Sequence, residues 1–286
     1  MASAPRAALR RCTPVASSGA VVTAGDRKAS SMDQLIVEMR RRLAVLVDAN
    51  DVGRFFLATY LRTTEAVAAE IDRGAFRDNA WVEQWDVAFA RYYLDARDNW
   101  DAQRSAPGPW DAAFAAADGP RLPPLRHVLL GMNAHINFDL PQALLAVISD
   151  EEFADRDLTT ARAADHAHID DVLAARTSKE DRELLAAEQP GDRTLLDRVL
   201  TPFNRAGTRR FLREARRKVW HNARLLSDAR RGGQLEARLD ELAALSRTRV
   251  SELRTTRQVL LVLATKGFGV QLLPSIAGPP PTTMEA

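Results

Sequence analysis

The spacing of apolar residues constrains the fold of this chain more than any other feature. From Met32 onward, aliphatic and aromatic residues recur three and four positions apart, which is the period of one helix face. Glycine and proline are sparse in the middle of the chain, whereas alanine, leucine, arginine and glutamate are frequent, so helix propensity is high over most windows. No stretch alternates as a strand would. The sequence therefore predicts an all-α fold, a single multi-helix bundle-like domain with a buried central helix.

Turn and capping signals divide this pattern into separate helices. Asp51 is predicted to be an N-cap, Gly74 a C-terminal stop, and Gly232-Gly233 a break between two helices. The expected helices begin at Met32 and continue over about residues 51–74, 79–103, 110–117, from 125 onward, 157–177, 180–188, 192–200, 205–231 and 234–265.

The two ends of the chain differ in composition from its middle. Residues 1–31 are rich in alanine, serine and arginine and lack the apolar core of a secretory signal, so we expect a disordered extension. Residues 32–276 are expected to form the helical domain, and the proline-rich residues 277–286 a disordered tail. Cys12 is the only cysteine, and no apolar run reaches the roughly 18 residues of a membrane span. These features predict a cytoplasmic protein with no transmembrane segment.

One helix that reads as buried carries an unusual number of polar side chains, in the segment Gly131–Pro141. Buried amides, imidazoles and carboxylates cost free energy unless they are paired, so such a segment builds either a polar network or a site. Side chains four positions apart lie along one face of a helix. Gly131 omits a side chain from that face, so another helix or a ligand can approach it. The predicted polar site consists of His127, Asn133, His135, Asn137 and Asp139, with Asp86 and Tyr93 from the helix at 79–103.

Two pairs within this chain have the spacing of helical metal ligands. His135 precedes Asp139 by four positions, and His166 precedes Asp170 by four. Such a pair can bind one divalent ion, such as zinc, from consecutive turns. If the two helices pack together, four nitrogen and oxygen ligands could converge. The sequence therefore names His135 and Asp139 as candidate metal ligands.

Other interpretations of the same residues stay open. Asp139 lies just before Pro141, so it could instead cap a new helix after a break. Asn133 and Asn137 are expected to tie neighbouring helices together. The segment around His166 and His168 is highly charged, which favours an exposed position for both imidazoles.

An arginine-rich stretch, residues 204–231, is the main candidate for contact with a large partner. It could bind phosphates or acidic lipid headgroups at a membrane surface. A solvated face that pairs with acidic helices is the simpler interpretation, because the net charge of the whole chain is only +2. Aromatic residues do not interleave with the arginines, so we do not expect nucleic-acid binding. The apolar segment Gly267–Pro274 could dock over the bundle, cover a pocket or touch a membrane.

The segment Trp85–Ala90, with Tyr93, Trp110 and above all Gly131–Pro141, resembles a bacterial family catalogued as domain of unknown function 5995. The resemblance covers about residues 33–255. It implies an all-helical fold with its hallmark around His135 and Asp139, and it implies no activity. A weaker likeness to the helical zinc-dependent phospholipase C and P1 nuclease group rests only on the spacing of histidine and aspartate.

Three functions fit these residues. The sequence favours a non-catalytic bundle that binds a small apolar or amphipathic ligand or has a structural role, because buried polar residues more often have structural than catalytic roles. One alternative is a divalent-metal-dependent hydrolase of an ester or phosphoester, in which His135 and Asp139, with His127 and Asp86, hold the ion. The other alternative is a membrane- or partner-binding protein that uses residues 204–231.

Overall fold

Helices make up all of the regular secondary structure in the part of the chain that the computed structural model describes, which is residues 30–119, 122, 124–187, 195–255 and 270–274. The all-α prediction is thereby confirmed. The predicted disordered ends fall almost entirely outside these residues. None of the helices within them is both long and apolar enough to cross a membrane.

The N-terminal helices are α1 (Ser31–Asp48), α2 (Gly53–Asp72) and α3 (Asn79–Gln103). The first begins at a capping box, in which Ser30 accepts from the backbone of Asp33 and the Asp33 carboxylate accepts in return. Asp51 lies two residues before α2, and its Oδ1 accepts from the N–H of Gly53 at 2.7 Å. Gly74 adopts φ +67° directly after α2, as its predicted stopping role requires.

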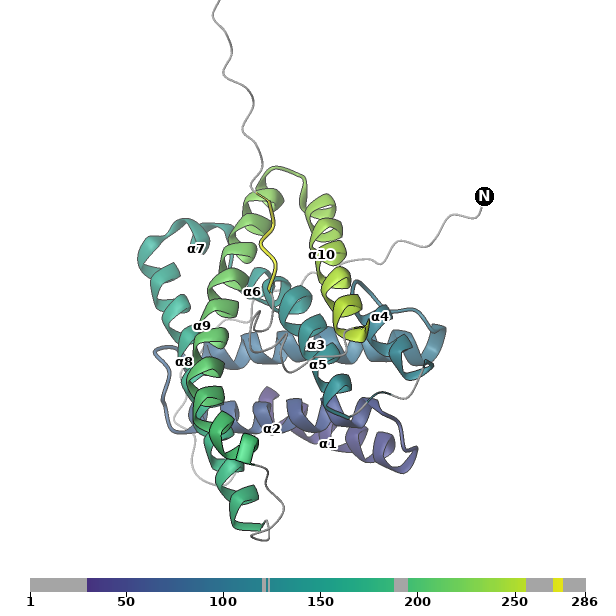
Figure 1. The fold of residues 1–286 in the computed structure, drawn as a ribbon. Helices are drawn as coiled ribbons and strands as arrows, with labels where there is room; N and C mark the ends of the chain where they lie inside the picture. Colours follow the sequence, from purple (N-terminus) through teal and green to yellow (C-terminus); the bar gives the residue numbers. More distant parts are fainter. Residues whose placement is uncertain (1–29, 120–121, 123, 188–194, 256–269, 275–286) are drawn as a thin grey trace, which may run out of the picture.

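The middle of the chain forms a nearly continuous helix that occupies the centre of the fold. It follows α4 (Trp110–Phe114) and the short 3-10 turn η1 (Ala115–Ala117). It consists of α5 (Pro124–Ala134), the π turn η2 (His135–Asp139) and α6 (Leu140–Val147). In Figure 1, α5 and α6 lie between the α1–α2 pair and the α9–α10 pair. Contacts with α2, α3, α9 and α10 enclose this helix, which is therefore the predicted buried central helix.

The C-terminal half contains α7 (Asp150–Ala154), α8 (Arg156–Ala187), α9 (Leu195–Arg231) and α10 (Leu235–Thr255). The breaks expected near residues 178–179 and 201–204 are wrong, because α8 and α9 each continue through them. Serine and lysine are tolerated inside helices, and Pro202 removes only one N–H from a long helix. Gly233 adopts φ +68° between α9 and α10, so the break predicted there is confirmed.

Candidate functional site

The predicted polar site is built on a π turn. At η2 the N–H of Leu140 donates to the carbonyl of His135, five residues earlier, instead of four. Pro141 explains this widening, because it has no N–H to donate and its ring crowds the preceding turn. The helix adds one residue to the turn and continues. Asp139 directly precedes α6 and Pro141 lies in the first turn of that helix, as the capping alternative expected. Asp139 nevertheless keeps a helical backbone, with φ −77° and ψ −39°, and makes no side-chain capping bond, so the expected break is absent.

Three buried side chains form a hydrogen-bonded chain at this turn. The Nδ1 atom of His135 lies 2.8 Å from Oδ2 of Asp139. The indole Nε1 of Trp110, from α4, donates to the same oxygen at 2.7 Å. All three residues are buried, and Asp139 is only 1% exposed. The π turn therefore aims two polar side chains at each other, and α4 completes the network from outside the helix.

Burial drives both ionisable members of this chain towards their neutral forms. It raises the pKa of Asp139 well above its usual value, and the hydrogen bond from Trp110 only partly opposes the rise. Burial also lowers the pKa of His135 well below its usual value. Both shifts favour the uncharged form of the group concerned, so burial disfavours an ion pair between His135 and Asp139 and favours a hydrogen bond between neutral groups.

Aromatic rings enclose the imidazole of His135. The ring of Phe89 stacks on it with a centroid distance of 3.6 Å and an interplanar angle of 7°. Tyr60 meets it edge to face at 4.6 Å, and the Tyr93 ring lies farther away at 6.3 Å. Nε2 is buried and has no hydrogen-bond partner among the described residues. His135 is therefore an interior ring with its free nitrogen in an aromatic environment.

The two asparagines of the signature bond within their own helix. Nδ2 of Asn133 donates to the carbonyl of Leu129 at 2.9 Å, and Nδ2 of Asn137 donates to Oδ1 of Asn133 at 3.2 Å. The prediction that they tie neighbouring helices together is wrong. Their four-residue spacing places each amide above the preceding turn, so the nearest acceptors belong to the same helix.

Gly131 and His127 lie on the same helix, one and two turns before η2. A Cβ atom at Gly131 would lie 2.5 Å from the ring of Phe56, so the missing side chain lets α2 pack directly on α5. Close approach of a helix was one of the two predicted uses of this glycine. His127 is 8% exposed and stacks near Phe55 at 6.5 Å. Burial lowers the pKa of His127, so its imidazole is neutral near pH 7.

Asp86 lies apart from the His135 network and faces a second buried cluster. No hydrogen bond between Asp86 and His135 is present, and Oδ2 of Asp86 has no partner among the described residues. Its charge acts instead on Tyr60 and on Arg216 of α9. Burial raises the pKa of Asp86 to about 7, although Arg216 opposes the rise.

The second histidine–aspartate pair belongs to this second cluster. His166 is 2% exposed, so its predicted exposure is wrong, whereas His168 is half-exposed. The rings of Trp85 and Trp220 flank the His166 imidazole at 5.2 and 5.6 Å. The prediction assumed that a highly charged segment faces solvent. In the structure, polar residues of this segment have specific partners inside the protein.

Those partners come from distant parts of the sequence. Asp165 accepts from the backbone N–H groups of Arg77 and Asp78 at 2.9 and 3.0 Å. Asp170 forms an ion pair with Arg216, whose side chain is 12% exposed. The arginine-rich stretch is therefore not a purely solvated face, since Arg216 turns inward to α8. The side chains of residues 204–212 lie outside the described part.

The geometry gives the predicted metal site little support. Among the described residues, no group of three histidine, cysteine, aspartate or glutamate side chains could hold a metal ion. His135 and Asp139 bond to each other, and the N–H of Trp110 points at the same oxygen that a cation would need. The two histidine–aspartate pairs do not converge, because the stacked rings of Trp85 and Phe89 lie between them.

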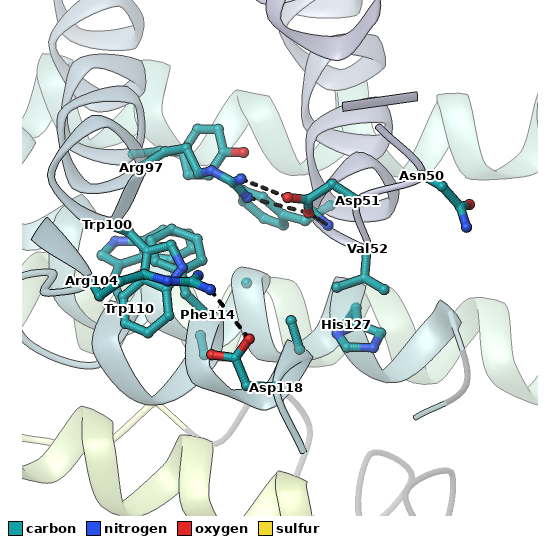
Figure 2. Close-up of a pocket in the computed structure, with 16 residues that line it drawn as sticks. Asn50, Asp51, Val52, Arg97, Trp100, Arg104, Trp110, Phe114, Asp118 and His127 are labelled. Carbon is teal, nitrogen blue, oxygen red and sulfur yellow. Dashed lines mark hydrogen bonds and ion pairs between the residues drawn. The ribbon is translucent and has the colours of Figure 1, made fainter. Parts of the chain in front are cut away.

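A pocket of about 280 Å³ opens on the other side of Trp110 (Figure 2). Its wall combines the aromatic side chains of Trp100, Trp110 and Phe114 with two arginines and His127. The lining residues are Asn50, Asp51, Val52, Gly53, Phe56, Tyr93, Arg97, Trp100, Arg104, Trp110, Ala113, Phe114, Ala117, Asp118, His127 and Gly131. Of the predicted site, only His127, Tyr93 and the glycine of the signature line it.

The two arginines of the pocket differ in how firmly they are held. Arg97 donates to Asp51 at 2.7 Å and to Asp101 at 2.9 Å. Arg104 lies 3.6 Å from Asp118, and both side chains are more than half exposed. Figure 2 shows both guanidinium groups on the same side of the pocket. Sequence reasoning missed both arginines because neither belongs to a motif, and only folding brings α3 beside α4 and the α1–α2 turn.

The comparisons with known proteins agree with the signature. Neither a curated protein nor a solved structure matches the chain. A family model described as a family of unknown function, DUF5995, matches residues 32–256, which include the π turn, both buried clusters and the pocket. The chain therefore belongs to the DUF5995 family.

Proposed function

We propose that this protein is a non-catalytic helical bundle that binds a small amphipathic anion in the pocket beside Trp110. The observation that carries the proposal is the composition of the pocket wall. Aromatic faces from α3 and α4 lie next to the guanidinium groups of Arg97 and Arg104 in a space of about 280 Å³. An apolar wall with a few placed polar groups is the usual form of a small-ligand site.

Arg104 is the residue best placed to bind the charged end of a ligand. Its ion pair with Asp118 is long and exposed, so it contributes little and exchanges readily for a ligand anion. Its guanidinium carbon lies 5.2 Å from the centre of the Trp100 ring, which keeps the charge beside an aromatic surface. Arg97 already forms ion pairs with two carboxylates, so its side chain is a fixed part of the pocket wall.

The backbone of the pocket rim supports this assignment. In the described part of the chain, Asn50 and Arg104 are the non-glycine residues with positive φ, at 51° and 53°, and both line the pocket. A left-handed conformation costs an arginine about 1 kcal/mol or more. Such strain tends to persist where it positions a side chain for function.

The His135 network supports the pocket from behind. Trp110 forms part of the pocket wall, and Asp139 holds its indole N–H in one orientation. His135 in turn holds Asp139, and the aromatic rings around the imidazole keep it away from the pocket. These residues therefore preorganise a wall, which favours a binding role over a hydrolytic one.

The proposal can be tested with 1-anilinonaphthalene-8-sulfonate, an amphipathic aromatic anion that fluoresces when it is buried. We expect saturable binding at one site of the folded protein and about fivefold weaker binding by Arg104→Gln, because one charge-assisted contact is lost. Arg73→Gln is the matched control, since Arg73 is similarly exposed and also paired with a carboxylate, at the end of α2.

A pocket-filling variant makes the test specific to this site. Ala117 lines the rim and is exposed, so Ala117→Trp should reduce probe binding while leaving the circular dichroism spectrum and melting temperature unchanged. Equal probe affinity in the wild type, Arg104→Gln and Ala117→Trp would contradict the proposal.

A further inference from the structure

A weakly held pair of opposite charges lies in the wall of the pocket beside Trp110. The guanidinium of Arg104 and the carboxylate of Asp118 both line this pocket, and Nη2 of the arginine is 3.6 Å from Oδ1 of the aspartate. This separation exceeds the length of a charge-assisted hydrogen bond. The two side chains are 67% and 57% exposed, so water competes for both groups. Figure 2 shows the pair beside the aromatic side chains of the wall.

The ends of two helical segments bring these charges together. Arg104 is the first residue after α3, and its N–H donates to the carbonyl of Trp100 at 2.8 Å while its backbone is left-handed. Asp118 is the first residue after η1, and its N–H donates to the carbonyl of Ala115 at 3.2 Å. The pair therefore does not arise from the spacing of residues along one helix. The fold holds the backbone of each residue in place, and the charged ends of both side chains line the pocket.

An aromatic surface continues from this charge pair along the pocket wall. The guanidinium carbon of Arg104 lies 5.2 Å from the centre of the Trp100 ring. The centre of the Phe114 ring lies 5.8 Å from that of Trp100 and 5.0 Å from that of Trp110. The three rings form one surface, against which an aromatic group of a ligand can pack. A ligand that uses both features carries its charges close to an aromatic ring.

The charge pair disfavours ligands that carry a single charge. An anion bound to Arg104 would be repelled by the carboxylate of Asp118, and a cation bound to Asp118 would be repelled by the guanidinium of Arg104. A ligand that carries both charges leaves neither side chain without a counter-charge. In an α-amino acid, the ammonium nitrogen and the carboxylate carbon are bonded to one carbon atom and lie about 2.5 Å apart. The two charges are therefore close enough together to contact both members of a pair 3.6 Å apart.

We infer that the ligand of this pocket is a free aromatic α-amino acid in its zwitterionic form, which rests on the proposed function and narrows its ligand to one class. The carboxylate is the anionic group and accepts from Arg104, and the ammonium group donates to Asp118. The aromatic ring packs on Trp100, Trp110 and Phe114. A residue inside a peptide carries neither terminal charge, so it does not meet these requirements. A space of about 280 Å³ is small for a ligand site, which suits a single amino acid.

The test compares three ligands that share a phenyl ring. L-phenylalanine carries both charges, 3-phenylpropanoate lacks the ammonium group, and 2-phenylethylamine lacks the carboxylate. Isothermal titration calorimetry with the full-length wild-type protein measures the affinity of each. We expect L-phenylalanine to bind about tenfold more tightly than either analogue, because it makes one more charge-assisted contact and leaves no charge of the pair without a partner.

Variants of the charge pair make the test specific to it. Asp118→Asn should weaken binding of L-phenylalanine about tenfold and leave 3-phenylpropanoate bound at least as tightly, because the repelling carboxylate is gone. Arg104→Gln should weaken binding of both ligands. Asp228→Asn is the matched control, since Asp228 is 55% exposed and paired with an arginine of α9 outside the pocket, and it should leave all affinities unchanged.

Failure of this ligand class and failure of the pocket itself give different results. The zwitterion is wrong and the proposed function stands if 1-anilinonaphthalene-8-sulfonate responds to Arg104→Gln and Ala117→Trp, but L-phenylalanine binds no more tightly than 3-phenylpropanoate. Equal affinity of Asp118→Asn and Asp228→Asn for L-phenylalanine, or no binding of this amino acid to the wild type, would also overturn the zwitterion. If the fluorescent probe responds to neither Arg104→Gln nor Ala117→Trp, the proposed function fails as well.

Discussion

Two pairs of residues with the same sequence spacing have different chemistry in this protein. His135 and Asp139 bond to each other and are both driven to neutral forms by burial. His166 and Asp170 are equally buried, yet Asp170 pairs with Arg216, and Nε2 of His166 has no partner among the described residues. The difference lies in the third residue, which is an uncharged indole in the first cluster and a guanidinium in the second.

This comparison shows that a four-residue spacing brings two side chains near each other without determining their ionisation. A buried carboxyl group stays protonated unless a cation compensates it. Trp110 offers one neutral hydrogen bond to the first cluster, whereas Arg216 offers a full charge to the second. The first cluster should therefore tolerate replacement of its carboxyl group by an uncharged amide, and the second should not.

The largest expected effect is loss of the ion pair in the second cluster. Asp170→Asn removes the carboxylate to which the largely buried Arg216 guanidinium is bonded, which should lower the free energy of unfolding by about 4 kcal/mol. Urea denaturation measures the loss. The neighbouring Asp171 is exposed, so Asp171→Asn should change stability by less than about 0.5 kcal/mol. A similar loss in both variants would show that the pair is not a buried ion pair.

The next effect concerns pH. Burial raises the pKa of Asp86 to about 7 from its ordinary value of 3.8, so between these values the folded state binds a proton that the unfolded state has released. The contribution of this carboxyl to stability is complete below pH 4 and is lost as pH rises towards 7. Relative to the wild type, Asp86→Asn should become more stable by about 3 kcal/mol between pH 4 and pH 8.

Thermal denaturation across this pH range measures the difference. Asp95→Asn, on the same helix but at an exposed position, is the control and should show a much weaker trend. If the free energies of unfolding of the wild type and Asp86→Asn change in the same way with pH, the group that titrates is not Asp86.

The first cluster should depend more on close packing than on charge. Gly131→Ala places a Cβ atom 2.5 Å from the Phe56 ring, so the overpacking should destabilise the protein by about 2 kcal/mol. Gly232→Ala is the control, because its nearest neighbour would lie at an ordinary 3.5 Å. Chemical denaturation of both variants tests the prediction, and a neutral Gly131→Ala would mean that α2 and α5 can separate at little cost.

The smallest expected effect is loss of the Asp139 carboxyl. Trp110 and His135 both contact one oxygen of Asp139, and the amide oxygen of an asparagine can accept there from Trp110 and from the Nδ1–H tautomer of His135. Asp139→Asn should therefore lower the free energy of unfolding by about 1 kcal/mol or less. Urea denaturation beside Asp170→Asn measures the contrast between the two clusters. If the two variants lose equal stability, the first pair carries a buried charge and the comparison fails.

Much of the fold could be predicted from the sequence because its signals act locally. Gly74 and Gly233 end helices through their positive φ, and the period of the apolar residues marks the helix faces. Pro141 correctly indicated an irregularity in the helix, but the sequence suggested a break there. The structure has a π turn instead, which accommodates a proline without a break. The expected breaks within α8 and α9 failed because no residue there compels the chain to leave the helix.

The candidate site could be predicted only in part. The sequence identified the polar stripe through His135 and Asp139, because buried polar residues stand out in an apolar helix. It did not identify Trp110, 29 residues away from the carboxyl to which it donates. Nor did it identify Arg104 and Asn50, since their relevance arises from a pocket formed by separate elements.

By itself, the sequence determined that the chain is helical, where most helices begin and end, and which helix is buried with polar residues on it. These properties depend on backbone propensities and on neighbours within one or two turns. Only the tertiary structure decided the partner of each buried polar group, as with Arg216 and Asp170, which are 46 residues apart. Ionisation, pocket shape and the docking of Val270–Pro274 on α9 and α10 depend on such distant partners, because the completed fold decides what surrounds each side chain.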